Sequence, residues 1–376
     1  MANGPPREMR PPAGAPMPAA RRRALHRGTG RRRLTSLGRG ALGAALLVLA
    51  AAQPGAADAP APRFGLPVGC VVGETCMIQN HFDHDPGPAA RDYACGGLTY
   101  DGHDGTDIRV ADLPAMARGV AVVAAAAGRV RAVRDGMADI DVRAAGGPAA
   151  VRGREAGNGV VVDHGGGWES QYSHLRRGSV AVAPGDRVAA GRMLGLVGMS
   201  GLAEFPHLHF EIRRAGRPVD PFVGPLGPAD RWTACGPGPD SLWSRAALAA
   251  LAYRPGGLLS AGFAGVVPDW TAARRGDYAA PALPRDSAVL VFWTAAFGVR
   301  EGDREEARLT GPDGTVITET DRVLDQPKAL WFGYFGRKRR GALWPAGTYR
   351  GDYRLTRAVD GEWREVARAT RTVELR

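Results

Sequence analysis

The sequence has no apolar run of the length that a membrane-spanning helix needs, which is about 20 residues. The nearest candidate, residues 40–52, contains only small and aliphatic side chains but is shorter than that. Arginine-rich sequence precedes it, and the small residues Gly55 and Ala57 follow it. This order is typical of a secretory signal peptide. We therefore predict a signal peptide over residues 1–57 and membrane contact only through that peptide, with an uncleaved anchor as the alternative.

Net positive charge is scarce outside this leader. Residues 1–57 contain ten arginines and one acid, Glu8, so they account for +9 of the whole-chain charge of +11. The remaining residues carry only +2. The basic character therefore belongs to the leader, and we predict no nucleic acid partner.

Cysteines are few, and none shows the close Cys-x-x-Cys spacing of a cysteine zinc site. The four cysteines, Cys70, Cys76, Cys95 and Cys235, all follow the leader. In an exported protein this even number suggests two disulfides. Three pairings are possible, of which we favour Cys70–Cys76 with Cys95–Cys235, because these bonds would join the two edges of the N-terminal domain.

Lysine is absent before Lys328. This absence matters for residues 184–191, which begin Pro-Gly-Asp and resemble a turn of the lipoyl and biotinyl carriers. Such carriers need a lysine to modify. The sequence therefore excludes a carrier domain here.

Histidines, by contrast, occur in an ordered pattern. Residues 206–212 read Pro-His-Leu-His-Phe-Glu-Ile. Successive side chains of an extended strand point to opposite faces, so His207, His209 and Glu211 share one face and the three apolar residues share the other. Two imidazoles so placed can converge on one small volume, and imidazole nitrogen is the commonest zinc ligand.

Upstream, His103 and Asp107 add one nitrogen and one oxygen donor. Their spacing is helical, but Gly102 and Gly105 favour a loop. A catalytic zinc needs three protein ligands and one open position. His103, Asp107 and one of the two histidines in residues 207–209 would complete such a set.

The order of these motifs resembles that of the lysostaphin/LytM-type zinc metallopeptidases, which cleave peptidoglycan peptides. The resemblance spans about residues 100–222 in one uninterrupted order. It is carried by the following pieces: His103-x-x-x-Asp107, residues 157–165 (Gly-Asn-Gly-Val-Val-Val-Asp-His-Gly), Tyr172-Ser173-His174-Leu175, residues 184–195 and Pro206-His207-Leu208-His209.

The resemblance implies that His103, Asp107 and His209 bind one zinc ion, and that His174 and His207 are unligated catalytic histidines. Spacing alone does not distinguish His207 from His209 as the ligand. The family also implies an endopeptidase acting on peptidoglycan cross-links, and the predicted signal peptide implies a periplasmic or secreted location. Family members that have lost their ligands serve as activators of other wall enzymes, so an inactive wall-binding module or amidase activator is the alternative function.

Other polar residues have competing explanations. The pair in His81-Phe82-Asp83-His84-Asp85 is a rival metal cluster, but it runs into Pro86-Gly87-Pro88, which signals a loop. His164 is expected at a strand end before a turn. Glu211 is either a partner that orients an imidazole or a solvated strand residue.

The sequence after the leader predicts a mainly β protein with two domains. Residues 58–63 read as a linker and 64–235 as an antiparallel LytM-type catalytic domain, while the glycine-rich and arginine-rich residues 138–155 form a long loop that is either functional or disordered. Residues 236–376 begin with a short helix over 242–253. Strands over 289–293, 307–309, 315–317, 348–355 and 362–372 then favour a smaller immunoglobulin-like β-sandwich.

A binding role for this second domain is an expectation from architecture alone. The basic run Arg337-Lys338-Arg339-Arg340 is typical of a solvated loop, with an anionic wall polymer or a protein partner as the alternative. A secreted lysin that uses this domain for targeting would share the same chemistry.

Overall fold

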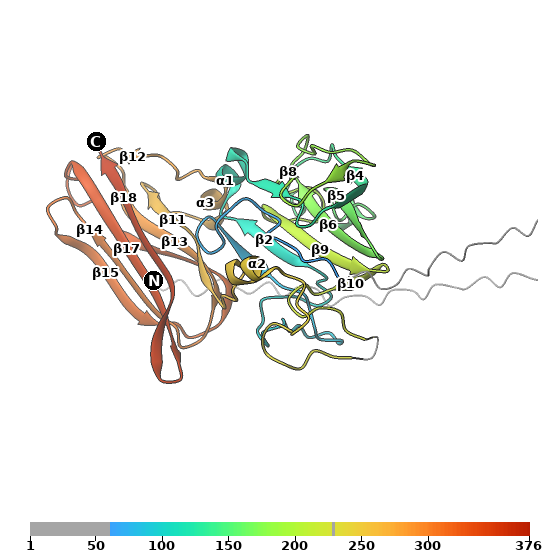
Figure 1. The fold of residues 1–376 in the computed structure, drawn as a ribbon. Coiled ribbons are helices and arrows are strands. Elements are labelled where there is room, and N and C mark those ends of the chain that lie inside the picture. Colours follow the sequence, from blue (N-terminus) through green and yellow to red (C-terminus); the bar gives the residue numbers. More distant parts are fainter. Residues whose placement is uncertain (1–60, 228–229) are drawn as a thin grey trace, which may run out of the picture. The chain divides into compact units, whose positions relative to one another are not determined.

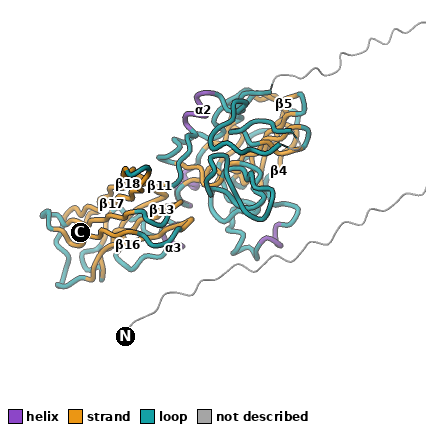
Figure 2. Tube along the Cα trace, turned by 90° about the horizontal axis from the view of Figure 1, so that it is seen from below, coloured by secondary structure: helices purple, strands orange, loops and turns teal. Residues whose placement is uncertain are grey.

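The computed structural model describes residues 61–227 and 230–376. The predicted signal peptide and the first part of the predicted linker lie outside the described residues. Strands dominate the described chain, and its helices are short (Figure 2). No described helix has both the length and the apolar composition to cross a membrane.

The first sheet has eight strands that pair antiparallel throughout (Figure 1). Its order is β1-β2-β9-β6-β5-β4-β7, and β10 pairs with β9. The strands are β1 (Cys76–Asn80), β2 (Thr106–Val110), β4 (Gly128–Arg134), β5 (Asn158–Gly165), β6 (Trp168–Leu175), β7 (Arg187–Val188), β9 (His207–Arg214) and β10 (Arg217–Val219). A separate pair joins β3 (Ala121–Val123) to β8 (Met193–Leu196).

Strand β9 confirms the predicted alternation. Leu208, Phe210 and Ile212 have no exposed surface and belong to the core beneath the sheet. Around them the core includes Trp168 and Tyr172 of β6. This apolar layer holds the opposite face of β9, with its histidines, in a fixed position.

The second β region contains two sheets that enclose their own core. One has the order β11-β13-β16 and the other β12-β18-β17-β14-β15. Their strands are β11 (Gly257–Ala264), β12 (Ala282–Leu283), β13 (Val289–Val299), β14 (Arg304–Thr310), β15 (Val316–Val323), β16 (Lys328–Lys338), β17 (Gly347–Val359) and β18 (Glu362–Leu375). Phe292 of β13, Phe335 of β16 and Tyr353 of β17 meet between the sheets. The five predicted strands are confirmed, and β11, β12 and β16 are additional.

Four short helical segments complete the structure: α1 (Leu113–Arg118), the 3-10 helix η1 (Pro148–Val151), α2 (Arg245–Ala250) and α3 (Trp270–Arg275). Helix α2 is present but shorter than the predicted helix over 242–253: it begins after the cap Ser244, not near Ser241, and ends at Ala250. However, Leu242, Ala247 and Leu251 pack in the core of the first sheet, not in the second core. Since burial decides where a helix belongs, we propose a domain boundary after Tyr253 in place of the predicted one at 236.

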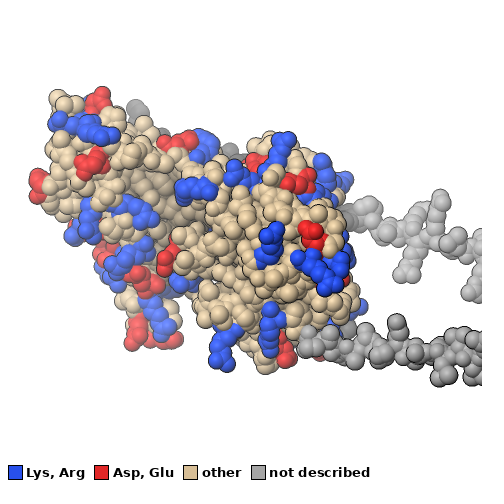
Figure 3. Space-filling view, turned by 45° about the horizontal axis from the view of Figure 1, so that its top comes forward, with Lys and Arg blue, Asp and Glu red and all other residues tan. Residues whose placement is uncertain are grey.

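Both predicted disulfides are present, Cys70–Cys76 and Cys95–Cys235. The second closes a separation of 140 residues, whereas the first closes only six. Charged side chains of the two signs are interspersed over the face shown in Figure 3, and neither sign forms a continuous field there.

Candidate functional site

Three neighbouring strands place the predicted ligands in one row. Asp107 of β2 lies opposite His209 of β9, and His209 lies opposite Ser173 of β6. His103 lies in the loop before β2, as expected, whereas Asp107 is already part of the strand. A side chain at Gly105 would bring a Cβ to 2.7 Å from the His209 ring, so glycine permits the close approach of the loop to β9.

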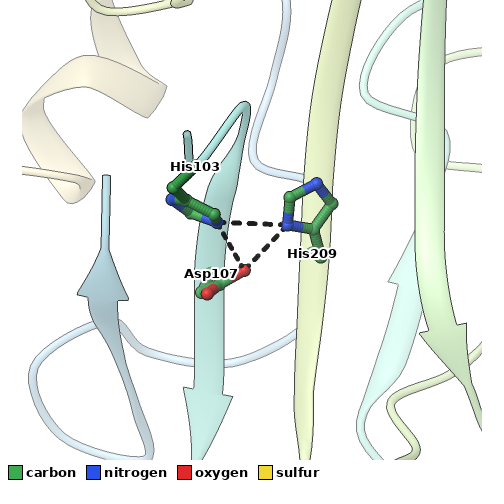
Figure 4. A group of neighbouring side chains, drawn as sticks. All are labelled: His103, Asp107 and His209. Carbon is green, nitrogen blue, oxygen red and sulfur yellow. Dashed lines mark hydrogen bonds and ion pairs between the residues drawn. The ribbon is translucent and has the colours of Figure 1, made fainter. Parts of the chain in front are cut away.

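The ligand atoms of His103, Asp107 and His209 face one another (Figure 4). His103 Nε2 lies 3.2 Å from Asp107 Oδ1 and 3.3 Å from His209 Nδ1, and the last two atoms are 2.9 Å apart. Tetrahedral ligands bonded to zinc at about 2.0–2.1 Å lie about 3.3 Å from one another. The donor set and its spacing therefore fit a zinc ion held by three protein atoms. Within residues 61–227 and 230–376, no other group of three such side chains converges in this way.

Hydrogen bonds orient each of the three groups. His103 Nδ1 lies 2.6 Å from the carbonyl oxygen of His81, and because a carbonyl only accepts, Nδ1 carries the proton and Nε2 presents a lone pair. The Asn80 amide donates to Asp107 Oδ2 at 2.8 Å, which leaves Oδ1 for the cluster. His209 Nε2 lies 3.4 Å from Asp104 Oδ1.

Electrostatics at the cluster favour a cation. Burial tends to raise the pKa of Asp107, but the neighbouring histidines His103 and His207 hold it well below the usual value. Burial likewise tends to lower the pKa of His209, yet the hydrogen bonds that its ring donates to Asp104 and Asp107 outweigh burial and raise this pKa to about 10. The two carboxylates therefore attract positive charge to this position, whether a proton or a metal ion supplies it.

His174 and His207 lie beside this cluster with ring centroids 4.6 Å apart. His174 Nδ1 donates to the carbonyl of Ser200 at 2.7 Å, and His207 Nδ1 donates to that of Phe205 at 2.8 Å. Burial lowers the pKa of both rings, so both are neutral near pH 7. Each ring therefore has an unprotonated Nε2 that can accept a proton.

The backbone of His174 adds an indication of function. Its φ of 61° lies in the left-handed region, which non-glycine residues adopt infrequently. The ring hydrogen bond to Ser200 and the backbone hydrogen bond to Ala156, at 2.9 Å, hold it there. Such strained residues cluster at functional sites.

A cavity of about 460 Å³ opens at four of the five residues. The Asp107, His174, His207 and His209 side chains line it, together with Val142, Arg143 and Pro148 of the long loop that the sequence predicts over 138–155. This loop is thus a wall of the site. A second cavity, of about 360 Å³, lies on the Asp104 and Glu211 side.

Sequence comparison identifies the protein family that the region of the five site residues resembles. A model of peptidase family M23 matches residues 101–221, which is about a third of the chain and contains all five residues of the site. Residues 101–221 therefore form an M23-like domain. The predicted resemblance to the LytM-type peptidases is confirmed for this M23-like domain.

The M23-like domain is similar to a peptidoglycan DD-endopeptidase, ShyA, of Vibrio cholerae, with 42% identity over 65 residues that cover 17% of this chain and 15% of that protein. It is also similar to the murein hydrolase activator EnvC of Escherichia coli, with 47% identity over 62 residues that cover 16% and 14%. The match thus spans only about a seventh of the length of these two curated relatives.

Among solved structures, the lysostaphin catalytic domain of Staphylococcus simulans aligns with 20% identity and a TM-score of 0.24, covering 38% of this chain and 85% of that domain. A likeness at this TM-score carries no weight. The assignment rests on the matched sequence of the M23-like domain.

The rival histidine pair does not form a metal group with the acids beside it. His81 is buried among the rings of Tyr93, Phe222 and Tyr253, and its Nδ1 has no partner. His84 pairs with Asp220 at 2.7 Å. The pair therefore packs and anchors the loop that carries His103.

Asp83 shows how that loop is held. Its Oδ1 accepts hydrogen bonds from the backbone N–H groups of Asp85 and Arg91, and its Oδ2 accepts one from Gly102, each at 3.0 Å. Gly102 directly precedes His103. The carboxylate of Asp83 thus fixes the chain next to a candidate ligand.

Two further expectations are settled away from the cluster. His164 lies at the end of β5, as predicted, and its ring contacts the Ala127 carbonyl and the Ser170 hydroxyl at 2.8 Å. Glu211 is buried, so it is not the solvated strand residue of one alternative. Its carboxylate lies 3.4 Å from Arg213, and burial raises its pKa.

Asn80 and Asp104 are the site residues that sequence reasoning missed. Asp104 lies inside the His103-x-x-x-Asp107 motif, which could have drawn attention to it. Asn80 gives no such signal, because its contact with Asp107 arises only from the pairing of β1 with β2.

Proposed function

We propose that the chain is an exported zinc metalloendopeptidase that hydrolyses peptide cross-links of bacterial peptidoglycan. One observation carries the proposal: three donor atoms, His103 Nε2, Asp107 Oδ1 and His209 Nδ1, converge beside two neutral imidazoles at the mouth of a cavity. A zinc hydrolase requires such an open three-ligand site.

A zinc ion bound there supplies two things, a lowered pKa of about 7 for its bound water and polarisation of the scissile carbonyl. The protein's own residues manage the protons. His174 and His207 each present an unprotonated Nε2, so one accepts a proton from the attacking water and returns it to the leaving amine. The imidazolium that results also stabilises the negative charge on the carbonyl oxygen.

The backbone carbonyls of Ser200 and Phe205 have a defined part in this scheme. They keep the Nδ1 atoms of His174 and His207 protonated and therefore fix which nitrogen faces the substrate. Loss of this orientation lowers the catalytic rate even when the imidazole itself remains.

An amidase activator is the second candidate function, favoured by the similarity to EnvC. The complete donor set argues for the peptidase. An activator needs neither three ligands nor a second pair of histidines with free Nε2 atoms, whereas a hydrolase needs both.

The exported location follows from the arginine-rich leader and the apolar run after it. The relatives named above include a peptidoglycan endopeptidase and a murein hydrolase activator, whose targets lie in the cell wall. We propose the periplasm or the outside of the cell as the place of action.

The deciding experiment is mass spectrometry of cross-linked muropeptides after incubation with the purified mature protein, beside the His209→Ala variant. Loss of cross-linked dimers with the native protein alone, with zinc bound to the native protein and not to the variant, supports the endopeptidase. Absence of cleavage by zinc-loaded native protein, together with stimulation of an amidase on the same wall material, supports the activator.

A further inference from the structure

A further cavity, of about 320 Å³, lies next to the site, and the second β region forms half of its wall. Its lining includes Gln79 and Asn80 of β1, Leu98 and Thr99 of the following loop, and Arg300 and Lys328. Gln79 and Asn80 also line the cavity at the candidate ligands. The two cavities therefore meet at the end of β1.

Asn80 connects the two cavities to the metal group directly. Its side chain donates to Asp107 Oδ2, so one face of this residue contacts a candidate ligand while another borders the further cavity. Each residue of an extended peptide spans about 3.3–3.6 Å. A substrate chain that leaves the metal group over Asn80 thus enters the further cavity within a few residues of the scissile bond.

The charge of the further cavity has one sign. No aspartate or glutamate lines it, whereas Arg300 and Lys328 supply two cations. Lys328 pairs with Val299 across β13 and β16, and Arg300 is the next residue of the chain, so both cations belong to the same end of these strands. Neither side chain forms a hydrogen bond or an ion pair with another residue of the described ranges.

Other arginines of the same β region behave differently. Arg304 pairs with Asp321, Arg308 pairs with Glu319 and Arg357 pairs with Asp303. Arg300 and Lys328 have no such acidic partner within the described ranges. Two like charges that line one cavity attract an anion.

We propose that this cavity is a carboxylate-binding subsite of the peptidase cleft, in which Arg300 and Lys328 bind a free carboxylate of the substrate peptide. The inference rests on the proposed function for the identity of the peptide, and it assigns the second β region a part in substrate recognition. Guanidinium groups bind carboxylates through two parallel hydrogen bonds, and an ammonium group adds a point charge.

Binding is measured in the His174→Ala background, which retains all three candidate ligands and does not consume the probe. The probes are purified muropeptide dimers and the same dimers after carbodiimide conversion of their carboxylates to amides. We expect the free acids to bind about tenfold more tightly than the amides, and Arg300→Ala with Lys328→Ala to abolish that preference. The double variant should keep its thermal unfolding midpoint and zinc content.

Lys338 provides a matched control. It is the only other lysine of the chain and ends the same strand that Lys328 begins, at the far end from the cavity. Lys338→Ala should retain the full preference for free acids. Equal binding of acids and amides by the parent, or equal loss of preference in Lys338→Ala, would overturn the subsite.

A cleavage assay separates this inference from the proposed function. If the native protein cuts no dimers while the acid preference depends on Lys328, the subsite stands and the endopeptidase proposal fails. If the native protein cuts dimers and the double variant cuts acids and amides with unchanged KM, the endopeptidase stands and the subsite is refuted.

Discussion

The two disulfides should differ strongly in their contribution to stability. Cys95–Cys235 closes a separation of 140 residues, whereas Cys70–Cys76 closes six. In the chain-entropy description, the constraint on the unfolded state grows with the logarithm of loop length and gives about 5 kcal/mol for the long loop and about 2 kcal/mol for the short one. We therefore expect replacement of Cys95 and Cys235 by serine to cost more than twice as much as replacement of Cys70 and Cys76.

The measurement is urea-induced unfolding of the mature protein, followed by far-ultraviolet circular dichroism and intrinsic tryptophan fluorescence. The two double variants carry the same chemical change but differ in burial as well as in loop length, because Cys76 is buried whereas Cys95 and Cys235 are exposed. Coincident transitions by the two probes are required before free energies are compared.

A second readout links the long disulfide to the site. Cys95 lies in the loop between β1 and β2, which also carries His103. We expect the Cys95→Ser, Cys235→Ser protein to bind zinc more weakly, and the Cys70→Ser, Cys76→Ser protein to bind it normally. Equal losses of stability in the two variants, or a larger loss for the short loop, would refute the reasoning from loop length.

Three further outcomes are expected. His174→Ala should lower kcat on muropeptide dimers about 10²–10⁴-fold while zinc content stays unchanged, and normal kcat would remove His174 from the proton-transfer role. Burial lowers the pKa of His81 to about 4, so the folded state resists its protonation while the unfolded state accepts a proton near pH 6.5. This contribution to stability is complete above pH 6.5 and is lost as the pH falls towards 4, by about 3 kcal/mol in total. The free energy of unfolding of the His81→Gln variant should therefore depend less on pH over that window. Asp83→Ala removes the acceptor of three backbone N–H groups, so it should lower the free energy of unfolding by about 3 kcal/mol and weaken zinc binding. Asp85→Ala loses only one such bond and should lose less stability in the same urea and zinc titrations.

The ligand motif could be predicted because it depends on local geometry. Alternation along a strand places His207 and His209 on the face opposite Leu208 and Phe210 in any sheet that buries one side. The glycines around His103 likewise indicated a loop. Family resemblance then distinguished His209 from His207, which the alternation alone could not do.

The helix at 245–250 shows the limit of local reasoning. The sequence predicted that a short helix lies here, but not its cap at Ser244, its length or its packing partner. Only the packed structure places Leu242 and Leu251 in the first core, because apolar residues next to a boundary can be buried on either side of it.

The sequence by itself determined the chemistry of the site: three candidate ligands, two further histidines, the two-disulfide count and the β-rich character. Tertiary structure alone decided which atoms face one another. The contact of Asn80 with Asp107, the carbonyls that fix the tautomers of His174 and His207, and the cavity that joins β1 to Arg300 and Lys328 all depend on strands far apart in the chain. Such contacts arise from strand order and register, which no local pattern specifies.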